Sequence, residues 1–265
     1  MFSKRMRAGK RLLFMTPLLL AAAACGDDYD TIDEPYTPPA PQAVITATGD
    51  IAAKVAEYRT LLGDPANGGT AGEQPAGRRE IGWDGAAANP FNNRNDFPAD
   101  FFNNQSKSGA VFATDGIGFR NDSTLFQEIE PTNADQFDFF SANRIFAPVG
   151  SPQMDVLFRV AGENTVASVT GFGVVFVDVD KANVASIELY DTQGRSLGVF
   201  AAPTRSDDKG LSFVGVKYST AIVARVRIRS GEAGLAAGVK DLSAGGNADL
   251  VVMDNFIYGE PHKIN

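Results

Sequence analysis

Two aspartates at the end of one apolar segment have the type and spacing to bind a metal ion. Residues 172–180, FGVVFVDVD, read as a β-strand, and Asp178 and Asp180 share one face of it, about 6.6 Å apart along the chain. Carboxylate oxygens, joined by carbonyl oxygens from loops, are the ligands that Ca²⁺ prefers. The pair therefore predicts a Ca²⁺ site if a nearby loop supplies further oxygens.

Asp84 and Asp254 are weaker candidates for the same ion. Asp84 stands before Gly85 at a turn, and Asp254 lies within the last apolar segment of the chain. No acidic run has the EF-hand spacing. The structural alternative is that each acid caps a turn or pairs with an arginine. Three further side chains are candidate oxygen ligands: Asp96, Asp100 and Asn255.

The composition excludes catalysis by histidine or cysteine. The chain has one histidine, His262, and one cysteine, Cys25. A Ser-His-Asp or Cys-His unit therefore has no base, and a zinc site of His and Cys has too few ligands. The sequence has no phosphate-binding P-loop and no dinucleotide-binding glycine motif.

Glycan binding is the other chemistry that the sequence supports. A sugar site needs an aromatic side chain with polar neighbours, and the candidates are Trp83, Asn95 and Asp96. Trp83 also alternates with polar residues as a core residue would, so burial is the competing interpretation. A glycoside hydrolase built on two carboxylates is an alternative, because that reaction needs only two acids at a suitable separation.

The elements that must position these residues are mostly β-strands. The strand 172–180 is apolar on both faces until its C-terminal end, which predicts a central strand covered on both sides. Residues 185–190 alternate in polarity, and the turn sequence DTQG at 191–194 leads back to Leu197 and Val199. Strand, turn and strand at this spacing predict an antiparallel hairpin.

Further strands are expected at short, regular intervals. Residues 221–229 alternate cleanly, and three arginines form a basic stripe on their solvated face. One helix is expected at residues 50–62, capped by Asp50, ended by Gly63, and packed on an edge or end of a sheet. The pattern predicts a mainly β fold, a jelly-roll-like β-sandwich with one short N-terminal α-helix. The remaining strands are expected at 110–114, 116–120, 154–160, 211–217 and 250–258.

Residues 86–107 form an unusual loop in which asparagine and aspartate are interleaved with phenylalanine. A loop of this length inside a compact domain is uncommon unless it is functional. Ten of the 19 phenylalanines lie between Phe97 and Phe146, so this part of the chain needs a substantial core. We expect the phenylalanines to hold the loop against that core.

The first 24 residues have the composition of a bacterial export signal. A basic segment ends at Arg11, and the apolar residues 12–24 suit a secretory signal and are too short to span a bilayer stably. The sequence LAAAACG then resembles a lipobox, with Ala22 where Leu is usual, and this resemblance implies cleavage before Cys25 and acylation of its thiol. The alternative is ordinary cleavage with an incidental cysteine. Several acyl chains would anchor the protein stably to the cell envelope, facing the periplasm or the cell surface.

Residues 25–46 are expected to form a disordered tether that starts at the lipidated cysteine. The segment is acidic and then proline-rich, with little apolar surface to bury. Removal of the first 24 residues, which carry five bases and no acid, leaves 19 bases against 32 acids. A chain this acidic is not expected to bind nucleic acid.

Two segments resemble a group of uncharacterised exported bacterial proteins. The first is GRREIGWDG at 77–85 followed by NPFNNRNDFPADFFN at 89–103, and the second runs from TGFGVVFVDVD to VVMDNFIYGEP. Together they cover most of residues 77–261. The resemblance implies an extracytoplasmic jelly-roll β-sandwich and implies no activity.

These observations predict a domain at residues 47–262, with 47–150 and 151–262 as an alternative division. We expect a lipid-anchored extracytoplasmic β-sandwich protein without catalytic activity, which binds a glycan or an envelope protein or has a structural role. Ca²⁺ is the one cofactor expected. The alternative is a carbohydrate-active hydrolase that uses a pair of carboxylates. A filled sandwich with Trp83 buried favours the first interpretation, and a cleft with two acids and an exposed aromatic favours the second.

Overall fold

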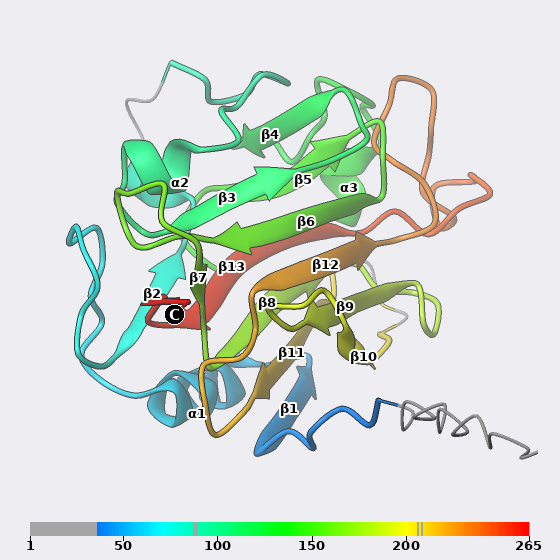
Figure 1. The fold of residues 1–265 in the computed structure, drawn as a ribbon. Coiled ribbons are helices and arrows are strands. Elements are labelled where there is room, and N and C mark those ends of the chain that lie inside the picture. Colours follow the sequence, from blue (N-terminus) through cyan, green and yellow to red (C-terminus); the bar gives the residue numbers. More distant parts are fainter. Residues whose placement is uncertain (1–35, 87–89, 206, 208, 265) are drawn as a thin grey trace, which may run out of the picture. The chain divides into compact units, whose positions relative to one another are not determined.

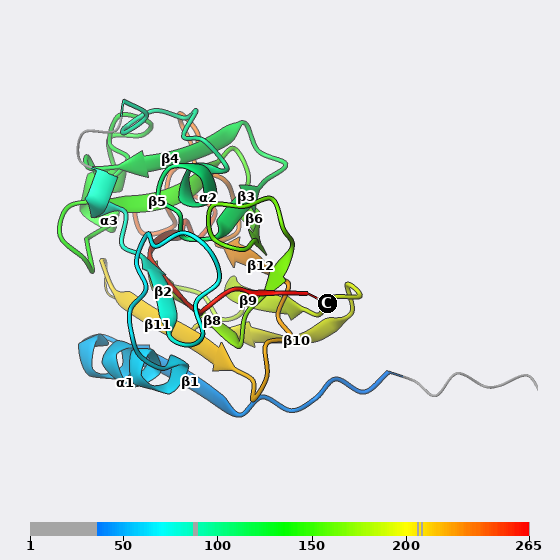
Figure 2. The same cartoon turned by 60° about the vertical axis from the view of Figure 1, so that its left-hand side comes forward.

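The structure is a computed structural model that describes residues 36–264 except 87–89, 206 and 208. The predicted signal peptide, Cys25 and the start of the predicted tether lie outside the described residues. Residues Pro38–Asn265 form one compact unit. This unit is mainly β, with two large antiparallel sheets that are not closed into a barrel, which confirms the predicted β-sandwich class (Figure 1, Figure 2).

The larger sheet, called sheet A, is built around the segment that the sequence marked as central. β8 (Gly171–Val177) pairs with an antiparallel strand on each side, and all of its seven residues are buried. Across the sheet the order is β1 (Ala43–Thr48), β11 (Leu211–Lys217), β8, β13 (Val252–Gly259), β5 (Ile145–Val149) and β4 (Gly118–Asp122), with β2 (Arg78–Ile81) also paired to β13.

β13 contains a bulge that divides it into two parts. Met253 stands opposite Phe176 on β8, whereas Phe256 stands opposite Val174, so β13 has one more residue than β8 between these pairs. An extra residue in one strand bends it and increases its twist. The part before the bulge pairs with β5 and the part after it pairs with β2.

The second sheet, called sheet B, has five strands and a regular alternation of buried and exposed side chains. β12 shows the pattern most clearly, because Val226 and Ile228 are buried while Arg227 and Arg229 are exposed. The order of strands is β10 (Ser196–Ala201), β9 (Ala185–Tyr190), β12 (Arg225–Ser230), β6 (Gln153–Phe158) and β3 (Ala110–Ala113), and a separate short pair joins β7 (Ala167–Ser168) to β14 (His262–Lys263).

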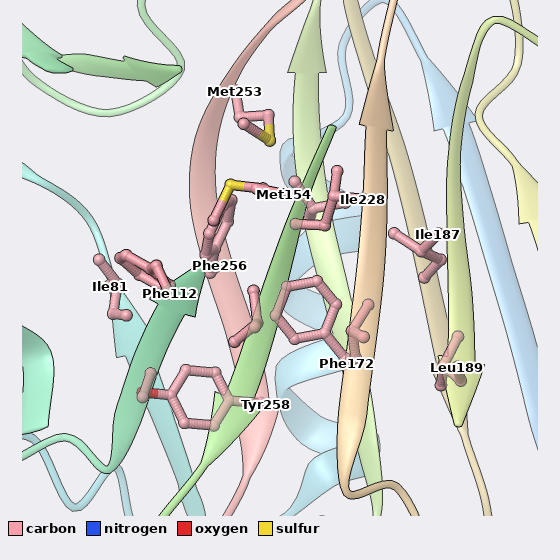
Figure 3. Packing of buried hydrophobic residues seen from close by; sticks show 14 of the residues in the cluster. Ile81, Phe112, Met154, Phe172, Ile187, Leu189, Ile228, Met253, Phe256 and Tyr258 are labelled. Atoms are coloured by element: carbon pink, nitrogen blue, oxygen red, sulfur yellow. The ribbon is translucent and has the colours of Figure 1, made fainter. Parts of the chain in front are cut away.

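The main core lies between the two sheets. Phe172 and Phe256 from sheet A face Met154 and Ile228 from sheet B, and all four are almost fully buried (Figure 3). Close packing of this kind is the largest favourable contribution to folding. Phe97 and Phe102 join the same core, the latter from the short helix α2 (Phe101–Asn104), so the Asn/Phe-rich segment is held by its phenylalanines, as expected.

Helix α1 (Ala52–Leu62) forms as predicted, but it packs against the outer face of sheet A and not on a sheet edge. Its residue before the first turn is Ile51, and Gly63 ends it with a positive φ of 102°. Tyr58 and Val55 contact a small core that includes Phe213 and Ile257 of sheet A. The edge placement was wrong because β8, β11 and β13 are apolar on both faces and need a cover on the side away from sheet B.

Loop segments cover the rest of the outer face of sheet A. Phe126 and Phe137, beside the short helix α3 (Asn133–Gln136), pack with Leu235 and Leu250 from the loop between β12 and β13. A third short helix, η1 (Asp84–Ala86), is of the 3₁₀ type. Sheet A is therefore covered on both faces.

The domain boundaries differ slightly from the prediction. The first strand, β1, begins at Ala43, inside the segment expected to be a disordered tether, because the alternating sequence AVITAT pairs with β11. The alternative division near residue 150 has no counterpart, since β13 lies between β8 and β5 in one sheet.

Candidate functional site

Four aspartates meet at one end of the sandwich. Asp178 follows β8 directly, with a positive φ of 69°, and Asp180 lies two residues further on. Asp241 and Asp249 come from the loop of residues 231–251, which connects β12 of sheet B to β13 of sheet A. We call these four residues the aspartate cluster.

The carboxylates of Asp180, Asp241 and Asp249 are close enough to share one ion, and Asp178 lies beside them. One oxygen from each of Asp180, Asp241 and Asp249 lies within 4.8 Å of the other two. Asp241 and Asp249 are fully buried, and Asp178 is fully buried beside them. The structure thus brings together the predicted pair, Asp178 and Asp180, and adds two acids that the sequence had not singled out.

Hydrogen bonds hold two of these side chains in place. Asp241 accepts bonds from the Ser243 backbone N–H at 2.8 Å and the Leu250 N–H at 2.7 Å. Asp249 accepts one from the Lys181 N–H at 2.6 Å through Oδ2. Within the described residues, however, Asp249 Oδ1 and both carboxylate oxygens of Asp178 are buried without a hydrogen-bond partner.

The electrostatics of the cluster oppose ionisation. Burial, and then the charges of Asp241, Asp180 and Asp249, raise the pKa of Asp178 to about 8. The nearby backbone N–H of Lys209 lowers this pKa, but its effect is smaller than that of burial and of the neighbouring charges. Burial also raises the pKa of Asp249, to about 6. The protein's own groups therefore leave much of the charge in the cluster uncompensated.

The other two metal candidates, Asp84 and Asp254, lie together at a different place. Asp254 is in the bulge of β13 and fully buried, and it accepts bonds from the Phe140 N–H at 2.8 Å and the Ser141 N–H at 3.1 Å. The Ser141 hydroxyl lies 2.8 Å from Asp254 Oδ1, 2.9 Å from Asp84 Oδ2 and 3.1 Å from Gly82 O. One hydroxyl has one proton for these three acceptors. Burial chiefly raises the pKa of Asp254 to about 7, and a protonated Asp254 would donate to the Ser141 hydroxyl, which leaves the hydroxyl proton for Asp84 or Gly82.

The candidate sugar-binding residues do not form one site. Trp83 is only 2% exposed, stacks on Phe146 with ring centroids 3.9 Å apart, and donates from Nε1 to Asp254 O at 2.9 Å. Asp96 pairs with Arg94 on the surface, at 2.9 Å, and Asn95 accepts a long bond of 3.4 Å from Arg120. One face of Trp83 lines a pocket of about 350 Å³ with Phe101, Phe102 and Glu80 among its walls.

The outer face of sheet B carries a row of paired polar side chains. Asp155 on β6 accepts from Arg225 at 3.0 Å and from Arg227 at 2.9 and 3.1 Å, both on the adjacent strand β12. The Arg225 guanidinium lies 3.6 Å from the ring centre of Tyr190 on β9. We call this surface the open face; its members are Gln153, Asp155, Ser186, Glu188, Tyr190, Arg225, Arg227 and Arg229.

Two shallow hollows lie on the open face, one on each side of Arg227. One, of about 110 Å³, is lined by Asp155 and Gln153 with residues that follow β3. The other, of about 260 Å³, is lined by Glu188, Ser186 and Arg229, with Val199 at its margin. The face therefore offers both hydrogen-bond donors and acceptors to a ligand.

Comparison with known proteins does not assign a function. No family model matches the chain, and no curated protein matches it. Among the described residues, no helix is long and apolar enough to cross a membrane. The aspartate cluster and the open face are therefore the two features of the molecule that bear on its function.

Proposed function

We propose that the protein is a non-catalytic, lipid-anchored protein of the bacterial cell envelope whose β-sandwich binds an anionic glycan on the open face. The proposal is based on a difference between the outer faces of the two sheets. Helix α1 and loop segments cover the outer face of sheet A, whereas the outer face of sheet B is polar and accessible in the described part of the chain. A fold that leaves one flat face uncovered has a surface available for an extended ligand.

The side chains of the open face are fixed before any ligand binds. Asp155 holds two guanidinium groups, and Arg225 is also stacked on Tyr190. Ordered side chains lose less conformational entropy on binding, so they contribute more to affinity than mobile ones. Sugar hydroxyls both donate and accept hydrogen bonds, which suits a face where arginine donors alternate with carboxylate and amide acceptors.

The charge of the open face favours a ligand that carries carboxylates. Its three arginines face two acids, Asp155 and Glu188, on a chain that is otherwise strongly acidic. Among the described residues, Arg229 has no carboxylate within 4 Å and donates from Nε to Gly231 O at 3.3 Å. An arginine in this state can bind a uronic acid carboxylate with two parallel hydrogen bonds.

The carbohydrate-active hydrolase that uses a pair of carboxylates has less support. One acid pair outside the aspartate cluster, Asp84 and Asp254, lies on either side of the Ser141 hydroxyl, and Asp254 is fully buried. A glycosidase acid must reach the glycosidic oxygen of its substrate. Trp83, the only tryptophan, is buried as well.

Polysaccharide binding by the full chain in detergent tests the glycan proposal. We expect polygalacturonate to bind and neutral dextran to bind more weakly. Arg229→Gln should weaken binding about tenfold, since a hydrogen bond to a charged group contributes roughly 1.5–3 kcal/mol. Arg94→Gln, on a surface away from the open face, is the matched control and should bind as the unchanged protein does. Equal binding by Arg229→Gln, or no binding of either polysaccharide, contradicts the proposal.

Two further measurements test the remaining parts. Release of new reducing ends from any polysaccharide, lost in Asp84→Asn or Asp254→Asn, would overturn the non-catalytic assignment. For the anchor, labelled palmitate should enter the full chain in bacteria and should not enter Cys25→Ser. Incorporation that persists in Cys25→Ser contradicts lipidation at that cysteine.

A further inference from the structure

We infer that the aspartate cluster binds one Ca²⁺ ion, which fixes the loop of residues 231–251 against the end of β8. This site is separate from the open face, and the inference does not depend on glycan binding. Asp178 and Asp180 come from the end of a central strand, and Asp241 and Asp249 come from the loop. The ion would join two segments that lie more than 50 residues apart in the sequence.

Unpaired oxygens show that the cluster is incomplete without a cation. Asp178 is 0% exposed, and neither of its carboxylate oxygens has a hydrogen-bond partner within the described residues. Asp249 is also 0% exposed, and its Oδ1 is unpaired although Oδ2 is bonded. Buried polar groups are otherwise almost always paired, and a buried carboxylate without a partner is costly. A metal ion held by Asp180, Asp241 and Asp249 would be a direct partner for the Asp249 carboxylate and a nearby positive charge for Asp178.

No protein cation takes this place in the described residues. Asp178, Asp241 and Asp249 have no lysine or arginine nitrogen within 4 Å. The nearest basic side chain along the chain, Lys181, turns to Glu232 and pairs with it at 2.6 Å. Glu232 in turn accepts a bond from the Asp249 N–H at 3.0 Å, which holds the loop but leaves the carboxylates uncompensated.

The spacing of the carboxylates fits an ion of the size of Ca²⁺. Ligand oxygens around Ca²⁺ lie about 2.3–2.6 Å from the metal, so two of them are at most about 5 Å apart. The oxygens of Asp180, Asp241 and Asp249 lie within 4.8 Å of one another. Ca²⁺ takes six to eight oxygens, and backbone carbonyls or water would complete the set.

The donor set excludes softer metals and disfavours Mg²⁺. All four side chains of the cluster are aspartates, which offer carboxylate oxygen. Zinc and copper sites use imidazole or thiolate ligands, and the described residues at the cluster include no histidine or cysteine. Mg²⁺ keeps several waters and uses one or two carboxylates, whereas Ca²⁺ accepts a cage of protein oxygens from flexible loops. Four carboxylates from a strand end and a loop therefore point to Ca²⁺.

The ion would have a mechanical role at the end of the sandwich. The loop of residues 231–251 carries Leu235 and Leu250 onto the outer face of sheet A, next to Val177 at the end of β8. Crowding of the buried Asp241 and Asp249 carboxylates against Asp178 acts to separate this loop from β8. A bound Ca²⁺ would attract the carboxylates from both segments, so it should hold the loop against sheet A.

Calcium binding by the full chain in detergent tests the inference. Isothermal titration with Ca²⁺ should give one site per chain, and thermal unfolding should shift upward by about 5–10 °C at a Ca²⁺ concentration 100 times the dissociation constant. Limited proteolysis should cleave within residues 231–251 faster in chelator than in Ca²⁺. Mg²⁺ at the same concentration should give a smaller thermal shift. No binding heat up to roughly 10 mM Ca²⁺, ten times the weak limit for extracellular modules, overturns the inference.

Asparagine variants separate this site from other acids. Asp241→Asn with Asp249→Asn keeps the hydrogen-bond acceptors and should abolish both the binding heat and the thermal shift. Asp254→Asn removes a buried carboxylate outside the cluster and should keep both. A shift that persists in the double variant, a shift lost in Asp254→Asn, or an equal shift with Mg²⁺ overturns the assignment. If the double variant does not fold, the titration of the unchanged protein and Asp178→Asn decide the outcome, because Asp178→Asn should weaken Ca²⁺ binding at least tenfold.

Discussion

Gly173 and Gly215 stand opposite each other on β8 and β11, and the ring of Tyr58 lies against both. A Cβ atom on Gly173 would lie 2.7 Å from Tyr58 Cε1, and one on Gly215 would lie 2.8 Å from Tyr58 Cδ2. The absence of side chains at this pair lets the Tyr58 hydroxyl donate to Val216 O at 2.9 Å. The contact fixes α1 on the outer face of sheet A.

Gly215→Ala should therefore destabilise the fold. Overpacking of a filled core costs about 1–3 kcal/mol, and the tyrosine ring cannot move without losing its hydrogen bond. Urea unfolding measures the loss. Gly85→Ala is the control, because a Cβ there meets nothing within 4 Å and should change stability by less than about 0.5 kcal/mol. A stability of Gly215→Ala equal to that of Gly85→Ala would contradict the packing argument.

The buried ion pair of Arg79 and Glu260 should be sensitive to loss of one partner. The side chains are 0% and 1% exposed, and the guanidinium also donates to the carbonyl oxygens of Gly68, Thr70, Gly72 and Lys107 at 2.7–3.1 Å. Arg79→Met removes the cation from the buried Glu260 carboxylate, which keeps only the hydrogen bonds from Asn67 and Gln74, and removes a donor from the four carbonyls, so we expect a loss of about 3–5 kcal/mol in urea unfolding. Arg94→Met breaks a pair whose side chains are 58% and 55% exposed, and should leave the stability nearly unchanged, because water already solvates both charges. Similar losses in both variants would show that burial does not decide the cost.

The raised pKa of Asp254 predicts a pH dependence of stability. Burial raises this pKa to about 7 from the usual 3.8. Between these values the folded state keeps a proton that the unfolded state releases, so stability should fall as pH rises from about 4 to 7, by at most about 1.4 kcal/mol per pH unit. Urea unfolding in chelator across this range measures the slope. Asp254→Asn cannot titrate and should show a smaller slope; an unchanged slope would assign the effect to other groups.

The fluorescence of Trp83 can show whether a ligand binds near the core or on the open face. Its ring packs among Phe102, Phe112, Phe146 and Phe256. We expect weak quenching by acrylamide in the folded protein, strong quenching after unfolding, and no change in emission when polygalacturonate binds. A large change on polysaccharide binding would place the ligand at the pocket beside Trp83 instead of the open face.

The distribution of apolar side chains along each strand is the part of the sequence that predicts the fold well. The run from Phe172 to Val177 is apolar on both faces, and β8 is central and covered on both sides. The position of α1 could not be predicted in the same way, because the glycines at 173 and 215 become a contact for Tyr58 only when β8 and β11 are paired.

The aspartate cluster shows why the candidate site was predicted only in part. Asp178 and Asp180 were recognisable because they end an apolar strand. Asp241 and Asp249 lie in a glycine-rich loop whose path is set by contacts with sheet A, so spacing along the chain does not reveal them. A signal was present in the form of two acids that flank the segment LSAGGNA, but the same composition is common in ordinary turns.

The place of β1 has a consequence for how the protein would bear a pulling force. β1 is the first strand of the compact unit, lies at an edge of sheet A, and has six residue pairs with β11 on one side. A chain held by its N-terminus receives tension at this strand before any other. The hydrogen bonds between β1 and β11 would break first, and α1 would be next, while the central strands β8 and β13 would remain paired. Extension of the chain would thus relieve the tension in steps, and the open face on sheet B would keep its shape during the first of them.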